Sequence, residues 1–200
     1  MRKYIPWIIV AVVVLIIYSS VKSTFNGMTL KDQEVKAAWA NVESNYQRRM
    51  DLIPNLVATV KGAANFEKET LIGITNARAS ATQVKIDPSN LSPANIQQFQ
   101  QAQDGVSSAL SRLLVTVEKY PDLKATENFR DLQVQLEGTE NRISVARNHF
   151  NDAVKDYNFS VKQFPAILFA NMFGFTEKGY FQSAMGADKA PDVDKTLNSK

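Results

Sequence analysis

Residues 35–63, VKAAWANVESNYQRRMDLIPNLVATVKGA, decide the fold of this chain. Their core-facing positions recur in alternating steps of four and three residues, which is typical of a helix packed in a bundle. These positions are Val35, Trp39, Val42, Tyr46, Arg49, Ile53, Leu56, Val60 and Ala63. Arg49 does not suit an apolar core, because a buried guanidinium needs acceptors around it. Pro54 predicts a kink or a short break, where Asp51 could cap a fresh start.

Upstream of this helix, residues 5–21 form an almost uninterrupted apolar run dominated by Ile and Val. At about 1.5 Å per residue, the run and its flanks reach roughly 26 to 30 Å, close to the hydrocarbon thickness of a bilayer. Tyr4 and Trp7 lie near one end and Tyr18 near the other, where amphipathic rings prefer the headgroup level. The run therefore predicts a transmembrane anchor that contacts the lipid bilayer.

A cleaved secretory signal is the alternative, because Arg2 and Lys3 make a short basic start. No Ala-x-Ala pattern follows the run and no cysteine is available for lipidation, so we favour a retained anchor. Basic residues flank the run on both sides, so the positive-inside rule assigns no orientation.

Three further helices are expected downstream, separated by prolines and by polar residues typical of caps and loops. Their expected limits are a cap at Asn65 for residues 66–84, a loop at 86–91, a helix from Ser92 to the residues before Pro121, and a long helix from Thr126 to Phe164, which Pro165 ends or bends. No stretch shows the period-two alternation of a half-buried strand. The expected class is therefore all-α: a single transmembrane helix, then an antiparallel up-and-down four-helix bundle with long first and last helices.

Chain length allows one soluble core. The expected divisions are residues 1–24 for the anchor and its flanks, 25–182 for the bundle with its apolar C-terminal segment 165–181, and 183–200 for a polar tail expected to be disordered.

Composition argues against several classes of function. The net charge is only +3, with basic and acidic residues interspersed, so nucleic acid is not an expected partner. The chain has no cysteine, and its one histidine, His149, lacks the partners of a zinc site. Phosphate-binding glycine loops and a Gly-x-Ser-x-Gly turn are also missing. We therefore expect neither an enzyme nor a bound metal or cofactor.

Polar residues stand out beside the expected core. On the last helix Glu140, Arg147, Asn151 and Asn158 make one stripe, and antiparallel packing brings Arg49 level with the segment between Glu140 and Arg147. The candidate polar layer consists of Arg48, Arg49, Asp51, Asn55, Glu140, Arg147 and Asn151, with Arg49 paired to Glu140. Either the layer sets the register of the helices or it binds a ligand.

The segment after Pro165 is too apolar for a free tail. Its candidate membrane or partner patch comprises Phe169, Phe173, Phe175, Tyr180 and Phe181. Alternatively, these side chains cap the open end of the bundle.

The chain resembles the LemA family over nearly all of residues 30–181. The matching positions are Trp39, Arg48, Arg49, Asp51 to Val57, Val60, Lys61, Ala77 to Ala79, Glu118, Tyr120, Pro121, Leu123 to Ala125, Leu136 to Ile143, Ala146, Arg147, Asn151, Tyr157, Asn158, Phe164 and Pro165. The resemblance implies a bacterial envelope protein with one amino-terminal membrane helix and a four-helix bundle, and it carries over no catalytic residue.

We expect a single-pass protein of the bacterial cytoplasmic membrane that serves as a non-catalytic adaptor or scaffold for another envelope protein. The alternative is a small-molecule or lipid binder that uses the polar layer around Arg49 or the aromatic C-terminal segment.

Overall fold

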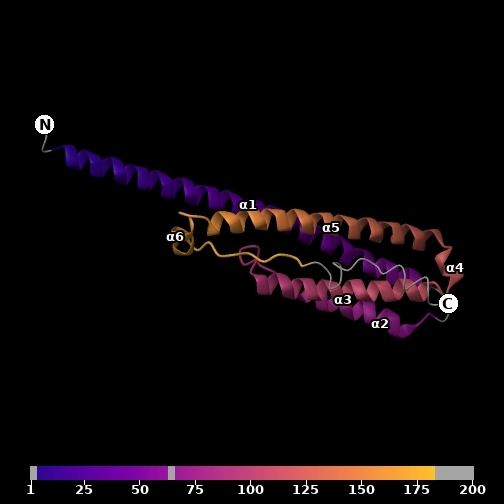
Figure 1. Cartoon of the computed structure of the whole chain (residues 1–200). Coiled ribbons are helices and arrows are strands. Elements are labelled where there is room, and N and C mark those ends of the chain that lie inside the picture. Colours follow the sequence, from indigo (N-terminus) through magenta and orange to yellow (C-terminus); the bar gives the residue numbers. More distant parts are fainter. Residues whose placement is uncertain (1–3, 63–65, 183–200) are drawn as a thin grey trace, which may run out of the picture.

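The computed structural model describes residues 4–62 and 66–182, and every regular element in these residues is helical (Figure 1). The elements are α1 (Ile5–Lys61), α2 (Lys68–Gln83), α3 (Pro93–Val117), α4 (Pro121–Lys124), α5 (Glu127–Lys162), α6 (Ile167–Ala170) and the 3₁₀ helix η2 (Asn171–Phe173). The predicted all-α class is confirmed.

The long helices α1 and α5 pack side by side, as predicted, and α2 packs on α3 (Figure 1). The chain reverses direction between successive long helices, so α5 runs back along α1 toward the amino-terminal end (Figure 1). α6 lies at that end of the bundle, close to α1, and the short α4 lies at the opposite end. The chain after η2 then returns along the bundle between α3 and α5.

The expected break at Pro54 is wrong, because α1 runs through Pro54 as one uninterrupted helix. A proline inside a helix has no N–H to donate to the carbonyl four residues earlier, here that of Met50. The Nε of Arg78 on α2 donates to the Met50 carbonyl oxygen at 3.0 Å. A neighbouring helix thus satisfies the carbonyl that Pro54 leaves free, and Asp51 caps nothing.

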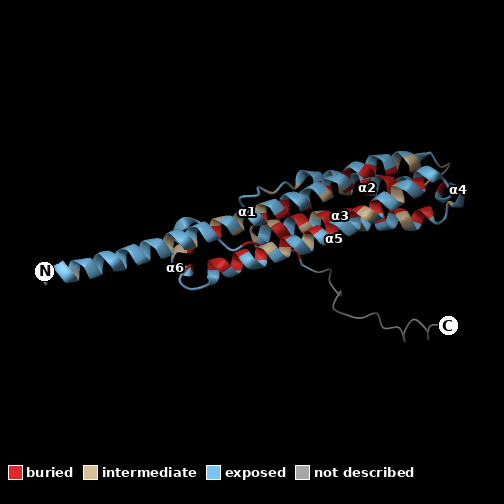
Figure 2. Cartoon of the chain, turned by 90° about the horizontal axis from the view of Figure 1, so that it is seen from above, coloured by how far each residue is buried: buried red, intermediate tan, exposed pale blue. Residues whose placement is uncertain are grey.

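One end of α1 extends beyond the rest of the molecule (Figure 2). Among the described residues, α1 is the helix long and apolar enough to cross a membrane, and none of its apolar window is buried. Because α1 continues from this end into the bundle, the expected boundary at residue 24 falls inside a helix. The exposed apolar end suggests membrane anchoring.

Buried residues lie along the inner faces of the packed helices (Figure 2). Their apolar side chains form two clusters. The cluster nearer the anchor contains Trp39, Phe99 and Phe150, and the distal cluster contains Leu56 and Leu113. Arg49 lies between the clusters, since Tyr46 belongs to the first and Met50 to the second.

Some of the predicted helix limits agree with the structure and others do not. Ser92 caps α3, because its Oγ accepts a hydrogen bond from the Asn95 N–H at 3.3 Å. Thr126 lies at the cap position of α5, but its hydroxyl donates to the Leu123 carbonyl and caps no N–H. The predicted end of the long helix at Phe164 is too late, because α5 ends at Lys162, and the Phe164 side chain beyond it is 80% exposed. The expectations for Ala63, Asn65 and residues 183–200 concern positions outside the described residues.

Candidate functional site

A buried arginine on α1 joins three helices. Arg49 is 1% exposed, and its Nη1 donates to Glu140 Oε1 on α5 and to Ser107 Oγ on α3, both at 2.8 Å. Its Nη2 donates to Gln103, to the side-chain oxygen at 2.6 Å and to the carbonyl oxygen at 3.2 Å. The guanidinium also lies 5.0 Å from the centre of the Tyr46 ring. The predicted pairing of Arg49 with Glu140 is present, and α3 supplies the remaining acceptors.

Three other members of the candidate layer lie outside it. Arg48, Asp51 and Asn55 are exposed, and Asp51 accepts a hydrogen bond from Gln47 on the same helix. Steps of three and four place these side chains together on the face of α1 that points away from the core. Closeness in sequence grouped them with Arg49, but the helical period separates them from it.

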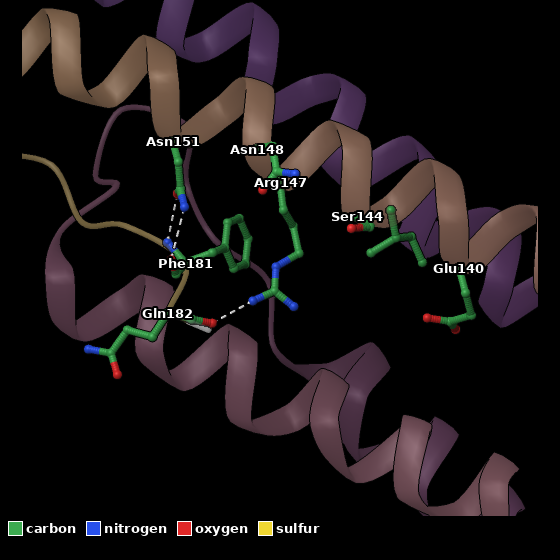
Figure 3. A pocket seen from close by; sticks show the side chains of 8 residues that line it. Glu140, Ser144, Arg147, Asn148, Asn151, Phe181 and Gln182 are labelled. Atoms are coloured by element: carbon green, nitrogen blue, oxygen red, sulfur yellow. Dashed lines mark hydrogen bonds between the residues drawn. The ribbon is translucent and has the colours of Figure 1, made fainter. Parts of the chain in front are cut away.

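Arg147 and Asn151 bind a different partner, the extended chain of residues 175–182, which we call the strap (Figure 3). Asn151 forms two hydrogen bonds with the backbone of Phe181, one to its carbonyl and one from its N–H, each at 2.9 Å. Asn158 holds the backbone of Lys178 in the same two-point manner, again at 2.9 Å. Arg147 donates to the Gln182 carbonyl at 2.7 Å. Arg147, Asn151 and Asn158 of the polar stripe of α5 thus pair with a polypeptide backbone.

The side of α3 holds the other edge of the strap. Gln100 makes both hydrogen bonds with the backbone of Gln182, and the Gly179 N–H donates to the Leu91 carbonyl at 2.9 Å. A Cβ atom on Gly179 would lie 2.6 Å from the Cα of Pro93, so this close approach needs glycine. Side chains of two helices therefore fix the strap largely through its backbone.

The strap overturns part of the predicted aromatic patch. Phe181 is 4% exposed and lies in the core, stacked on Trp39 at 6.1 Å and edge-on to Phe150 at 5.4 Å. Phe175 packs against the same cluster. Phe181 therefore belongs to no surface patch, because the strap turns this side chain inward.

The remaining members of that patch keep part of their surface exposed. Phe169 is half-buried, while Phe173 and Tyr180 are 38% and 42% exposed. The structure therefore divides the five aromatic residues between the core and the surface.

An ion pair between buried Lys178 and partly buried Asp32 joins the strap to α1. Lys178 is 6% exposed, and its Nζ lies 2.8 Å from Asp32 Oδ1 and 4.8 Å from the centre of the Tyr157 ring. Burial opposes ionisation of Asp32, but hydrogen bonds and charges from Lys178 and Lys36 outweigh it and hold the pKa of that carboxyl below its ordinary value. Burial, with the charge of Asp32, raises the pKa of Tyr157 to about 12. The anchor-proximal end of α1 is thus coupled to the strap.

We expect the ion pair between Asp32 and Lys178 to lose its stabilising effect in acid. A carboxyl whose folded pKa lies below its ordinary value of 3.8 stabilises the fold fully above that value, and the contribution is lost as the pH falls through the folded pKa. Asp32→Asn should therefore lower the melting temperature near neutral pH, and the difference from the natural protein should shrink below about pH 4. Circular dichroism melts across this range measure the effect, and parallel curves for the two proteins would contradict it.

Two hollows that meet at Glu140 lie along this side of the bundle. One hollow of about 280 Å³ lies between α5 and the strap, beside Phe181 and Gln182, and reaches Glu140, as Figure 3 shows. A second, of about 360 Å³, continues from Glu140 between Leu110 and Leu114 of α3 and Leu136 of α5. We call these two hollows together the α3–α5 groove.

Sequence reasoning missed Gln100, Gln103, Asp32 and Lys178, which act through contacts between distant segments. The sequence did indicate Asn158, because it belongs to the predicted polar stripe of the last helix. His149 is exposed, and within the described ranges 4–62 and 66–182 no three His, Cys, Asp or Glu side chains are placed to hold a metal ion.

Comparison with known proteins gives distant relatives. Magnetosome protein MamQ 2 of Paramagnetospirillum magneticum is 25% identical over 183 residues, covering 82% of this chain and 66% of that protein. Magnetosome protein MamQ of Magnetospirillum gryphiswaldense matches with the same identity and coverage. Protein LemA of Metamycoplasma hominis is 23% identical over 156 residues, covering 78% of this chain and 68% of the relative. The chain thus spans 66% of the length of the MamQ relatives it matches.

The family comparison covers most of the chain. Residues 38–194 match the model of the LemA family, and this range includes Arg49, its partners on α3 and α5, and the strap. This chain belongs to the LemA family.

Proposed function

We propose that this chain is a single-pass protein of a bacterial inner membrane and a non-catalytic adaptor for another envelope protein. In this proposal, an extended segment of the partner lies in the α3–α5 groove. The observation that carries the proposal is that α3 and α5 already hold one extended segment by hydrogen bonds and that a hollow lined by both helices lies along them.

The chemistry of the groove favours a polypeptide. At its anchor-proximal end Arg147 and Asn151 already pair with backbone groups of the strap, so this face of α5 holds an extended chain. Its distal end is apolar, because Leu110, Leu114 and Leu136 line it. A partner segment with apolar side chains fits this combination, as in other recognition modes that use backbone hydrogen bonds and side-chain pockets.

A small-molecule site around Arg49 has weaker support. The hollow beside Glu140 holds about 280 Å³, slightly below the range of roughly 300 to 1,000 Å³ typical of ligand pockets. Both terminal nitrogens of Arg49 already donate to protein acceptors, although its buried Nε has no partner among the described residues. This arrangement suits a layer that joins helices.

Site-specific crosslinking in living cells tests the adaptor proposal. A photoreactive amino acid replaces Ser111, which lines the groove, or Ser80, an exposed serine of α2, as the matched control. We expect one envelope protein to crosslink at position 111 and not at position 80. Mass spectrometry maps the crosslinked segment, and a synthetic peptide of that segment should bind the purified protein and lose binding in the Ser111→Arg variant. Equal crosslinking at both positions, or a peptide that does not bind, would refute the proposal.

A further inference from the structure

An exposed apolar surface lies at the anchor-proximal end of the bundle, on and beside α6. Its members are Phe164 at 80%, Ile167 at 51%, Leu168 at 63% and Met172 at 70% exposure. No residue from 163 to 176 carries a charge. All four lie within nine residues of the chain, and exposed apolar residues that gather in this way mark an interaction site. We call these four residues the α6 patch.

The position of the α6 patch relative to the anchor follows from aromatic contacts. The ring of Phe25 on α1 lies 5.1 Å from Phe173 and 5.6 Å from Phe175, both edge-on. These contacts fix the segment around α6 at the level of Phe25, and Figure 1 shows α6 close to α1 at this end of the bundle. α1 is one continuous helix through this level, so no hinge separates the anchor from the α6 patch.

The distance along α1 gives the depth of α6 relative to the bilayer. The apolar run ends at Val21, four residues before Phe25, which corresponds to about 6 Å along a helix axis. The headgroup layer on each side of a bilayer is about 5 to 8 Å thick, since the hydrocarbon is about 30 Å and the whole bilayer about 40 to 45 Å. A bilayer spanned by residues 5–21 therefore has its headgroup layer at the level of α6.

We propose that the α6 patch inserts into the headgroup layer of the membrane that α1 spans, as a second lipid contact beside the anchor. Short apolar surfaces bind membranes in this way when their side chains reach the boundary between headgroups and acyl chains. The contact holds the bundle at a fixed tilt over the lipid surface. It needs only the anchor and is independent of any adaptor partner.

Because the chain has no cysteine, single-cysteine labelling can test this contact without further changes. Leu168→Cys carries an environment-sensitive fluorophore in the full chain, reconstituted in vesicles of phosphatidylethanolamine and phosphatidylglycerol with doxyl-labelled lipid as quencher. Val115→Cys, 68% exposed on α3, is the control. We expect a blue-shifted emission and a loss of about half of the fluorescence at position 168, and neither at position 115.

A second variant distinguishes insertion of the α6 patch into the membrane from a position that is close to the membrane only because α1 is anchored there. Ile167→Glu with Met172→Glu places charge on exposed positions, so the helical melt should stay unchanged while the quenching at position 168 disappears. Quenching that survives these charges, or equal signals at positions 168 and 115, would overturn the proposal. A blue shift that requires high protein concentration and occurs equally in detergent would assign the α6 patch to a second copy of the chain, and would also overturn it.

Discussion

Arg49→Ala is expected to lower the free energy of unfolding by about 3 kcal/mol, as measured by urea denaturation. The substitution removes all the bonds of a guanidinium that is 1% exposed, and it leaves the buried side chain of Gln103 without its donor. It also opens a void between the two apolar clusters. Arg49→Met should cost clearly less, because Met fills much of the void that Ala leaves, while Gln103 loses its donor in both variants.

The pairing with Glu140 is measured by a double-mutant cycle. Glu140 is 45% exposed, so Glu140→Ala alone should cost less than Arg49→Ala. Since the two side chains share a hydrogen bond of 2.8 Å, we expect a coupling energy of about 1 kcal/mol. Costs that add within about 0.3 kcal/mol would contradict a role for this pair in setting the helix register.

Phe181→Ala should cost about 3 to 5 kcal/mol, the range for removing a large aromatic side chain from a core. Phe181 contacts Trp39, Phe99 and Phe150, so its loss leaves a cavity at the centre of the anchor-proximal cluster. The strap should loosen as well, which hydrogen exchange of the backbone amides at Lys178 and Phe181 would report.

Tyr180→Ala is the matched control, because the neighbouring side chain is 42% exposed and points away from that cluster. Among the described residues its hydroxyl accepts one hydrogen bond, from Asn158 at 3.3 Å, and Asn158 also donates to the Lys178 carbonyl oxygen. We expect a cost below about 1 kcal/mol and unchanged exchange in the strap. Similar losses for both substitutions would contradict the inward orientation of Phe181.

Prediction from sequence worked best for residues on helices. The seam of α1 and the level of Arg49 opposite Glu140 followed from a rise of about 1.5 Å per residue and an antiparallel return. The grouping of Arg48, Asp51 and Asn55 with Arg49 failed because nearness in sequence ignored the direction of each side chain. The predicted break at Pro54 also failed, because Arg78 from another helix donates to the carbonyl that Pro54 leaves without an intrahelical partner.

Prediction from sequence was least successful for the strap. Its aromatic residues were recognised as too apolar for a free tail, but their division between core and surface was not predicted. The strap has no helical period, and its main partners recognise backbone groups common to every residue. Gln100 and Gln182, for instance, are 82 positions apart, and neither identity signals the other.

The sequence by itself determined the helical class, the apolar end of α1, the buried faces and the need of Arg49 for a carboxylate. Each of these depends on periodicity or composition within one segment, which the chain carries locally. The tertiary structure alone decided which helices supply the remaining acceptors of Arg49, that Pro54 leaves α1 unbroken, and where the strap lies. Those outcomes depend on hydrogen bonds between distant segments, and such bonds are satisfied only once the helices have packed.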